Sequence, residues 1–255
     1  MRLRPLALGA ILSVSVCAPA FAQQSSSEMP TVDSKRDIKL DLSVDEVYDS
    51  NIAHSSPATA AARGLQLEDF TTRPLLNIDA SQPIGQQILF LQGSAGYDFH
   101  ANNTQLNRER FDLEGGIVSP FQTCRATLFG IYKAQQSDLV DVTDLISTDT
   151  ENLLQTKGVS AGAQCGRKQG LGGLFMAQHL ETSNSAPLEQ LANARTNTFT
   201  GDLTYTNARL GLIGVTASYS ESEFPDRPPL ITAEAGTRFW SEMTGLTAAH
   251  DFGSK

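Results

Sequence analysis

The stretch QILFLQGSAGYDFH, residues 87–100, shows the pattern that decides the fold. Its odd-numbered positions carry an apolar or small set: Leu89, Leu91, Gly93, Ala95, Tyr97 and Phe99. The even-numbered positions are more polar, although Phe90 is one of them: Phe90, Gln92, Ser94, Asp98 and His100. A period of two is typical of a β-strand with one apolar and one polar face. The segment is also longer than an average strand of about 5–6 residues.

The same alternation recurs from Asp37 onward. In the first segment, Ile38, Leu40 and Leu42 alternate with polar residues, whereas Phe129 and Ile131 interrupt the pattern in a later one. The sequence therefore predicts an all-β protein of about ten strands, over residues 37–45, 75–80, 87–100, 108–118, 123–135, 154–165, 171–182, 196–206, 210–222 and 238–250.

The segments between these strands alternate in length. Short connections fall at 81–85, 119–122, 166–170 and 207–209. Longer ones fall at 51–68, 136–151, 183–194 and 223–237, and one of medium length falls at 101–107. Outer-membrane barrels have short periplasmic turns and longer extracellular loops, and several predicted strands approach the length that a tilted spanning strand needs. We therefore predict an antiparallel transmembrane β-barrel.

The N-terminus has the three parts of a secretory signal peptide. Arg2 and Arg4 supply positive charge, residues 6–16 are apolar but too short to span a bilayer, and residues 20–22 supply the small residues of a cleavage site. The alternatives are a short buried helix and lipidation of Cys17. We expect a signal peptide, a flexible leader and a barrel domain, over residues 1–22, 23–36 and 37–255.

After removal of the signal peptide, the chain keeps Cys124 and Cys165. An even pair in an exported protein predicts a disulfide, with two free buried thiols as the alternative. Cys124 begins one predicted strand just after a short turn, and Cys165 ends the next strand just before another. In an antiparallel pair these positions lie side by side, so we expect a cross-strand disulfide at the periplasmic edge.

Composition and motifs exclude several classes of protein. The net charge of −9 argues against nucleic-acid binding, which requires a basic surface. After the N-terminus no apolar run is long enough for a transmembrane helix. The sequence lacks the motifs of a nucleophile elbow, a zinc protease helix and a phosphate-binding loop. No recurring metal-ligand spacing connects the histidines, at 54, 100, 179 and 250. We therefore expect no enzyme activity, no metal and no cofactor.

The two faces of the predicted strands differ in kind. Aromatic residues lie near strand ends on the apolar face, as in the interfacial girdles of barrels: Tyr97, Phe99, Tyr132 and Tyr205. The polar face carries charged residues that would line the lumen: Asp98, Arg110, Asp112, Glu114, Arg125 and Lys133. These residues either pack and solvate the lumen or select solutes. A secreted, soluble β-sandwich binding protein is the alternative fold.

Two short segments resemble a family of β-barrel porins from proteobacterial outer membranes, often found with exopolysaccharide export machinery. The first is VYDSNI, residues 47–52, in which Tyr48, Asp49 and Asn51 match and Ser50 replaces the usual second acid. The second is YSESEFPDR, residues 219–227, whose matching positions include Tyr219, Pro225 and Arg227. The resemblance implies a barrel in the outer membrane and polysaccharide export proteins as partners, but no known substrate.

Members of that family are usually longer. The chain ends at Lys255, without the terminal aromatic residue with which outer-membrane barrels commonly finish. We expect the N-terminal part of a larger barrel, with a complete ten-stranded barrel as the alternative.

The function that follows is a porin-like channel or export conduit in the outer membrane. Its partners would be outer-membrane lipid and the barrel-assembly machinery. The alternative within the same fold is a structural barrel or surface receptor that acts through its long loops without transport.

Overall fold

The computed structural model describes residues 29–30, 32, 34–136, 152–167, 169–187, 189–207, 209, 211–227 and 237–249. The predicted signal peptide, most of the leader, the greater part of the predicted loop at 136–151, and His250 lie outside the described residues.

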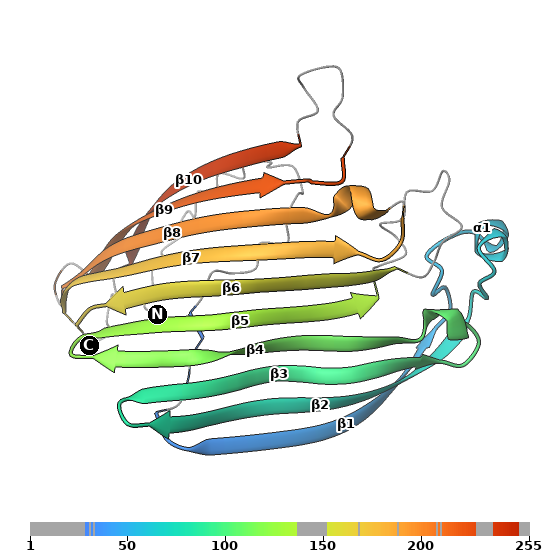
Figure 1. Ribbon diagram of the computed structural model, residues 1–255, viewed down its shortest axis with the longest axis horizontal. Helices are drawn as coiled ribbons and strands as arrows, with labels where there is room; N and C mark the ends of the chain where they lie inside the picture. The colour runs from blue at the N-terminus through green and yellow to red at the C-terminus, as the bar shows by residue number, and fades with distance from the viewer. Residues whose placement is uncertain are drawn as a thin grey trace, which may run out of the picture.

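Ten antiparallel strands form a single sheet in which every strand pairs with its neighbours in the sequence (Figure 1). The all-β prediction is confirmed. The strands are β1 (Asp37–Asp49), β2 (Asp69–Ile84), β3 (Gln87–His100), β4 (Arg108–Phe121), β5 (Cys124–Gln136), β6 (Leu153–Cys165), β7 (Gly170–Asn184), β8 (Ala194–Asn207), β9 (Gly211–Glu223) and β10 (Arg238–Ala249). Three short helical turns lie in the connections: α1 (Pro57–Ala62), η1 (Thr104–Leu106) and η2 (Glu189–Ala192).

The largest difference from the predicted strands concerns β2. The alternation predicted residues 75–80, but the strand extends over Asp69–Ile84. Pro74 and Pro83 lie within it, and a proline cannot donate a backbone hydrogen bond to a neighbouring strand. The pairing with β1 nevertheless continues on both sides of Pro74: Tyr48 pairs with Phe70 before it, and Ile38 pairs with Ala80 after it.

Short turns gather at one end of the sheet, at the left in Figure 1, and the long connections with α1 gather at the other. Two of the short turns need the left-handed backbone region, at Gly85 (φ 63°) and Gln122 (φ 52°). Glycine reaches this region without strain, which suits the tight β2–β3 turn. The alternation of short and long connections is therefore present in the folded chain.

The disulfide is also confirmed. Cys124 and Cys165 are register partners on β5 and β6, and their sulfur atoms are bonded. The bond joins the short-turn ends of the two strands, 41 residues apart in sequence.

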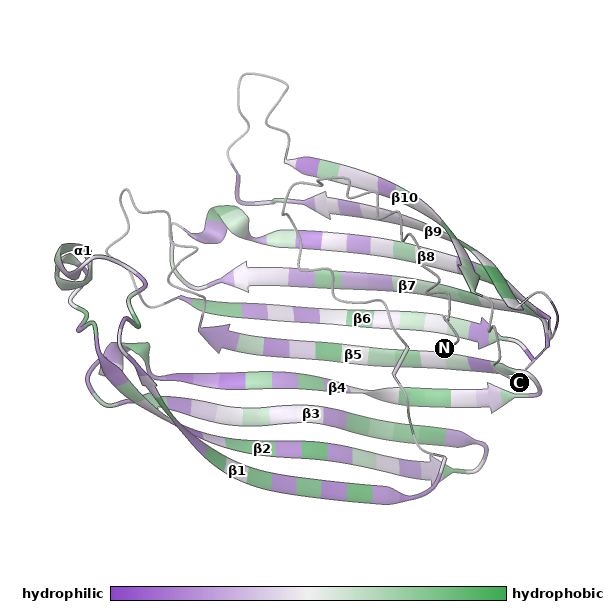
Figure 2. Ribbon diagram, turned by 180° about the vertical axis from the view of Figure 1, so that it is seen from behind, coloured by the Kyte–Doolittle hydropathy of each residue, from purple (hydrophilic) through white to green (hydrophobic). Residues whose placement is uncertain are grey.

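The sheet is strongly curved, and its two faces differ. Large apolar side chains are exposed on the convex face, which Figure 1 shows toward the viewer, including Leu40, Leu91, Leu128 and Leu203. The concave face, seen from behind in Figure 2, carries most of the charged and hydroxyl side chains of the central strands.

Within the described residues β1 pairs only with β2, and β10 only with β9. The sheet is therefore open there, and the closed barrel stays a prediction. No helix among the described residues is long and apolar enough to cross a membrane.

Candidate functional site: the polar concave face

The register places all six predicted lining residues on the concave face. Asp98 is cross-strand to Arg108 and lies beside Arg110, while Asp112 is cross-strand to Lys133. The full set comes from β3, β4 and β5: Asp98, Arg110, Asp112, Glu114, Arg125 and Lys133. Because residues two apart on a strand point to the same side, these neighbouring strands form one charged surface.

Opposite charges alternate across this surface. The carboxylate of Asp98 lies 3.8 Å from Arg73 Nε and 3.6 Å from Arg110 Nη2. Asp112 binds Lys133 Nζ at 3.1 Å. We call these five residues the charge ladder. The sequence did not single out Arg73, because it lies in the part of β2 that the predicted segment left out.

Two further predicted residues are held by amides rather than by ions. Gln92 Nε2 donates to Glu114 at 3.3 Å, and Arg125 donates to Gln164 at 3.2 Å. Glu114 and Arg125 therefore keep their formal charges without a partner of opposite sign in these contacts.

On β8 and β9 the concave face changes character and becomes rich in hydroxyl groups. Thr196 hydrogen-bonds to Ser222 at 3.0 Å, and Thr198 to Ser220 at 3.2 Å. The series continues toward the short turns with Thr200, Thr204, Thr206, Thr216 and Ser218. A surface of this kind offers donors and acceptors without fixed charge.

A cavity of about 920 Å³ lies on this side of the sheet, at the short-turn end. Arg125, Arg167 and Asp202 supply charge, and Thr204 and Thr216 supply hydroxyl groups. The strands β5 through β10 all contribute lining residues, as do the short turns at Gln122 and Gly166.

An apolar cluster interrupts the polar concave face near the same end. Its five strand residues, all at most 8% exposed, are Ile88, Phe90, Val118, Phe129 and Met176. We call these residues the apolar belt. It explains the break in the alternation at Phe129 and Ile131, since both point to the concave side and contribute to this cluster.

The long connections build a separate polar network around Asp69, the first residue of β2. Asp69 is fully buried and accepts hydrogen bonds from the backbone N–H groups of Asn102 (2.9 Å) and Asn103 (3.1 Å). The side-chain amide of Asn103 adds a third at 2.8 Å. Asn103 in turn binds the backbone of Gln66, so this network ties two long connections together.

The same network does not form a nucleophilic triad. Thr71 Oγ1 and Asp69 Oδ2 both approach His100 Nδ1, at 3.1 and 3.4 Å. A triad needs the nucleophile on one ring nitrogen and the carboxylate on the other. Within the described ranges no group of three or more His, Cys, Asp or Glu side chains could hold a metal ion.

Loss of the Asp69 carboxylate is expected to destabilise the two long connections that its hydrogen-bond network holds together. Asp69→Ala leaves three donors near Asn103 without their charged acceptor, and each such bond is worth about 1.5–3 kcal/mol. We expect faster proteolysis at residues 101–107 and a lower unfolding midpoint. Asp49→Ala is the matched control, since its register partner is Asp69 but its carboxylate accepts a hydrogen bond from the exposed Asn51 N–H. Equal proteolysis of the two variants would contradict the role of Asp69.

The family-like residues lie at two separate connections. Tyr48 donates to Glu68 at 3.0 Å and packs against Phe70 with the two rings tilted by 43°, near the loop that contains α1. The guanidinium of Arg227 lies 3.7 Å from the ring centroid of Phe224 and donates from Nε to the Leu191 carbonyl. Tyr219 is on the convex face of β9, and Pro225 is in the turn after it. These residues brace loops and do not converge on one site.

No protein-family model, curated protein or solved structure matches the chain.

Proposed function

We propose that the chain forms an outer-membrane barrel that acts as a polar conduit, with the convex face against lipid and the concave face lining the lumen. The observation that carries the proposal is the distribution of charge between the faces. The charged convex residues of the described strands lie toward the long connections, among them Glu109, Glu181, Arg195 and Arg238. Lys157 on β6 and Glu242 on β10 reach farthest from those connections, each as the fifth residue of its strand. From these residues to the short turns, the described convex positions hold no Asp, Glu, Lys or Arg.

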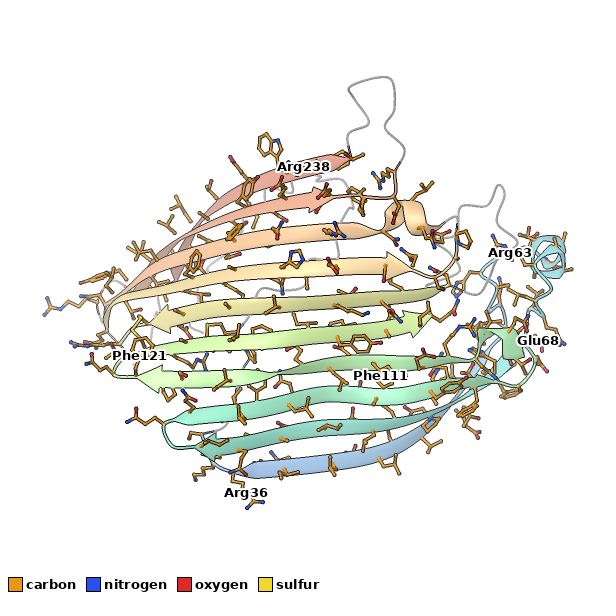
Figure 3. All side chains as sticks on the ribbon, in the orientation of Figure 1. Arg36, Arg63, Glu68, Phe111, Phe121 and Arg238 are labelled. Carbon is orange, nitrogen blue, oxygen red and sulfur yellow. A yellow bond between two sulfur atoms is a disulfide. The ribbon has the colours of Figure 1, made fainter. Side chains whose placement is uncertain are left out.

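The height of this uncharged band suits a membrane. Phe111 and Phe121 bound it on β4, toward opposite ends of the strand (Figure 3). Ten residues at about 3.4 Å each span ~34 Å along the strand. A strand tilted by about 40° would cover ~26 Å of membrane, close to the band of roughly 25 Å that outer-membrane barrels show.

The pairing register supports a tilted, barrel-like sheet. One row of paired residues begins at Ile38, the second residue of β1, at the short-turn end. It passes through Leu91, Gly130 and His179 and reaches Trp240, the third residue of β10, near the long connections. Such a drift of register is the shear that closure of a barrel requires.

Closure is part of the proposal. In lipid an unpaired backbone group costs several kcal/mol, so the outer edges of β1 and β10 must be hydrogen-bonded in the membrane. β1 runs toward the long connections and β10 away from them, so both edges can continue an antiparallel arrangement.

Acidic residues outnumber basic ones on the concave face of the described strands, so we expect the conduit to favour cations. The acidic set is Asp37, Asp41, Asp45, Asp49, Asp69, Asp79, Asp98, Asp112, Glu114 and Asp202, and the basic set is Lys39, Arg73, Arg108, Arg110, Arg125 and Lys133. Rings of acidic side chains select cations in known channels.

The test is the reversal potential of single channels in a planar bilayer under a salt gradient. We expect a cation-selective potential that Asp112→Asn moves toward zero, because this change removes a lumenal charge. Glu109→Gln is the matched control, since Glu109 is on the same strand and faces the convex side. A correctly folded protein that carries no current would contradict the conduit. Equal shifts from the two variants would contradict the assignment of the faces.

One observation favours the second candidate, a barrel without transport. The apolar belt and the residue Met29 packed on it occupy part of the concave side, which narrows any lumen there. An interaction barrel or surface receptor would use the loops braced by Asp69 and Arg227 instead of a pore.

A further inference from the structure

The apolar belt is unusual for its position. Ile88 and Val118 are register partners, and the rings of Phe90 and Phe129 lie 6.3 Å apart between their centroids. Met176 extends the belt onto β7. Large apolar side chains in a water-filled lumen would be costly, so a cover is expected over them.

The chain supplies its own cover. Met29, which precedes β1, is 9% exposed and packs in the belt, and Val32 packs against its margin. Further along, the carbonyl of Lys35 accepts a hydrogen bond from Ser81 Oγ at 2.7 Å. We call the described residues Met29, Pro30, Val32 and Lys35 the strap. It contacts the belt through Met29 and Val32, and β2 through Lys35.

Met29 lies against Gly162 on the sheet. A Cβ atom at Gly162 would be in ordinary van der Waals contact with the sulfur of Met29, at 3.6 Å, so the two residues are direct neighbours. Gly162 and Met176 are register partners on β6 and β7, which places this contact within the belt.

The belt that the strap covers lies beside the cavity at the short-turn end. Leu174 lines that cavity and packs against the belt that Met29 covers. The charge ladder lies farther toward the long connections, because Asp112 and Asp98 follow the belt residues along their strands in that direction. The strap is therefore beside the cavity and on the short-turn side of the charge ladder.

We infer that the strap is a built-in constriction of the conduit, an intramolecular ligand of the apolar belt that narrows the lumen on the periplasmic side of its charged part. The inference rests on the proposed function for its effect on flow, whereas the binding of the strap to the belt can be tested by itself. Displacement of the strap widens the lumen and exposes the belt to water.

The binding is tested by thiol labelling of the folded protein in lipid vesicles with a bulky, water-soluble maleimide. Met29→Cys is expected to react far more slowly than Ser34→Cys, since Met29 is buried and Ser34 is exposed. Unfolding in denaturant should make the two rates equal. Equal rates in the folded protein would overturn the strap.

The constriction is tested by single-channel conductance. Met29→Asp and Val32→Asp each place a charge against the belt, so a severalfold rise in conductance is expected. Ser34→Asp adds the same charge at an exposed position and should leave the conductance unchanged. An unchanged conductance in both belt-facing variants would overturn the constriction. Absence of current from every variant, with the thiol at position 29 still protected, would overturn the conduit and the constriction but not the binding of the strap.

Discussion

Loss of the disulfide is expected to lower the free energy of unfolding by about 3–4 kcal/mol. Cys124 and Cys165 close a segment of 41 residues that holds the β5–β6 connection. A cross-link of this length restricts the unfolded chain and leaves the folded pairing in place. The variant is the double substitution Cys124→Ser and Cys165→Ser, and the measurement is the urea unfolding midpoint of the protein in detergent micelles.

Reduction of the unsubstituted protein is the control for this result. It should produce the same lowering of the midpoint as the double substitution, because both remove the same bond. A midpoint that neither treatment changes would contradict the stabilising role of the disulfide. A loss of folded protein in the double variant but not after reduction would assign the effect to the serine side chains.

Leu203→Arg is expected to have the other large effect. Leu203 is 54% exposed on the convex face of β8, within the uncharged band where the proposal places lipid. An arginine at the middle of the bilayer destabilises an outer-membrane barrel by about 2–4 kcal/mol. The measurement is the fraction of protein that migrates as the folded form on an unheated SDS gel.

Thr204→Arg is the matched control, because the next residue points to the concave face and lines the 920 Å³ cavity. A wet cavity accepts a cation at little cost, so the folded fraction should stay near that of the unsubstituted protein. If the convex face lay in water, Leu203→Arg would be tolerated and its folded fraction would stay near that of the unsubstituted protein. The pair therefore separates a lipid-facing surface from a soluble sheet.

Local patterning could predict the strands and the disulfide but not the surfaces that distant segments create. Period-two alternation located nine strands closely, since each has one apolar face. It shortened β2, where Thr71 and Arg73 alternate with Thr72 and Pro74, neither of which is strongly apolar. The disulfide followed from the positions of Cys124 and Cys165 beside short turns, which the antiparallel order brings together.

The candidate site was predictable only in part for the same reason. Charges on adjacent strands, such as Asp112 and Lys133, could be placed on one face from strand parity alone. The belt could not be recognised, because Phe90 and Phe129 are apolar residues at positions that parity assigns to the polar face. The sequence did contain one indication of the belt. Phe90 and Phe129 both break the alternation, and the strands that carry them, β3 and β5, are separated by β4 alone.

The central claim is that the convex face lies against lipid, and Trp240 offers a direct test. It is the single tryptophan of the chain, 67% exposed, and its register row places it on the convex face near the long connections. Tryptophan at that position belongs to the interfacial girdle of a barrel. The measurement is the quenching of its fluorescence in vesicles by lipids brominated at different depths of the acyl chain. We predict strong quenching by bromine near the headgroups and weaker quenching by bromine near the bilayer centre. Quenching by aqueous acrylamide alone, with no effect of brominated lipid at any depth, would contradict the account.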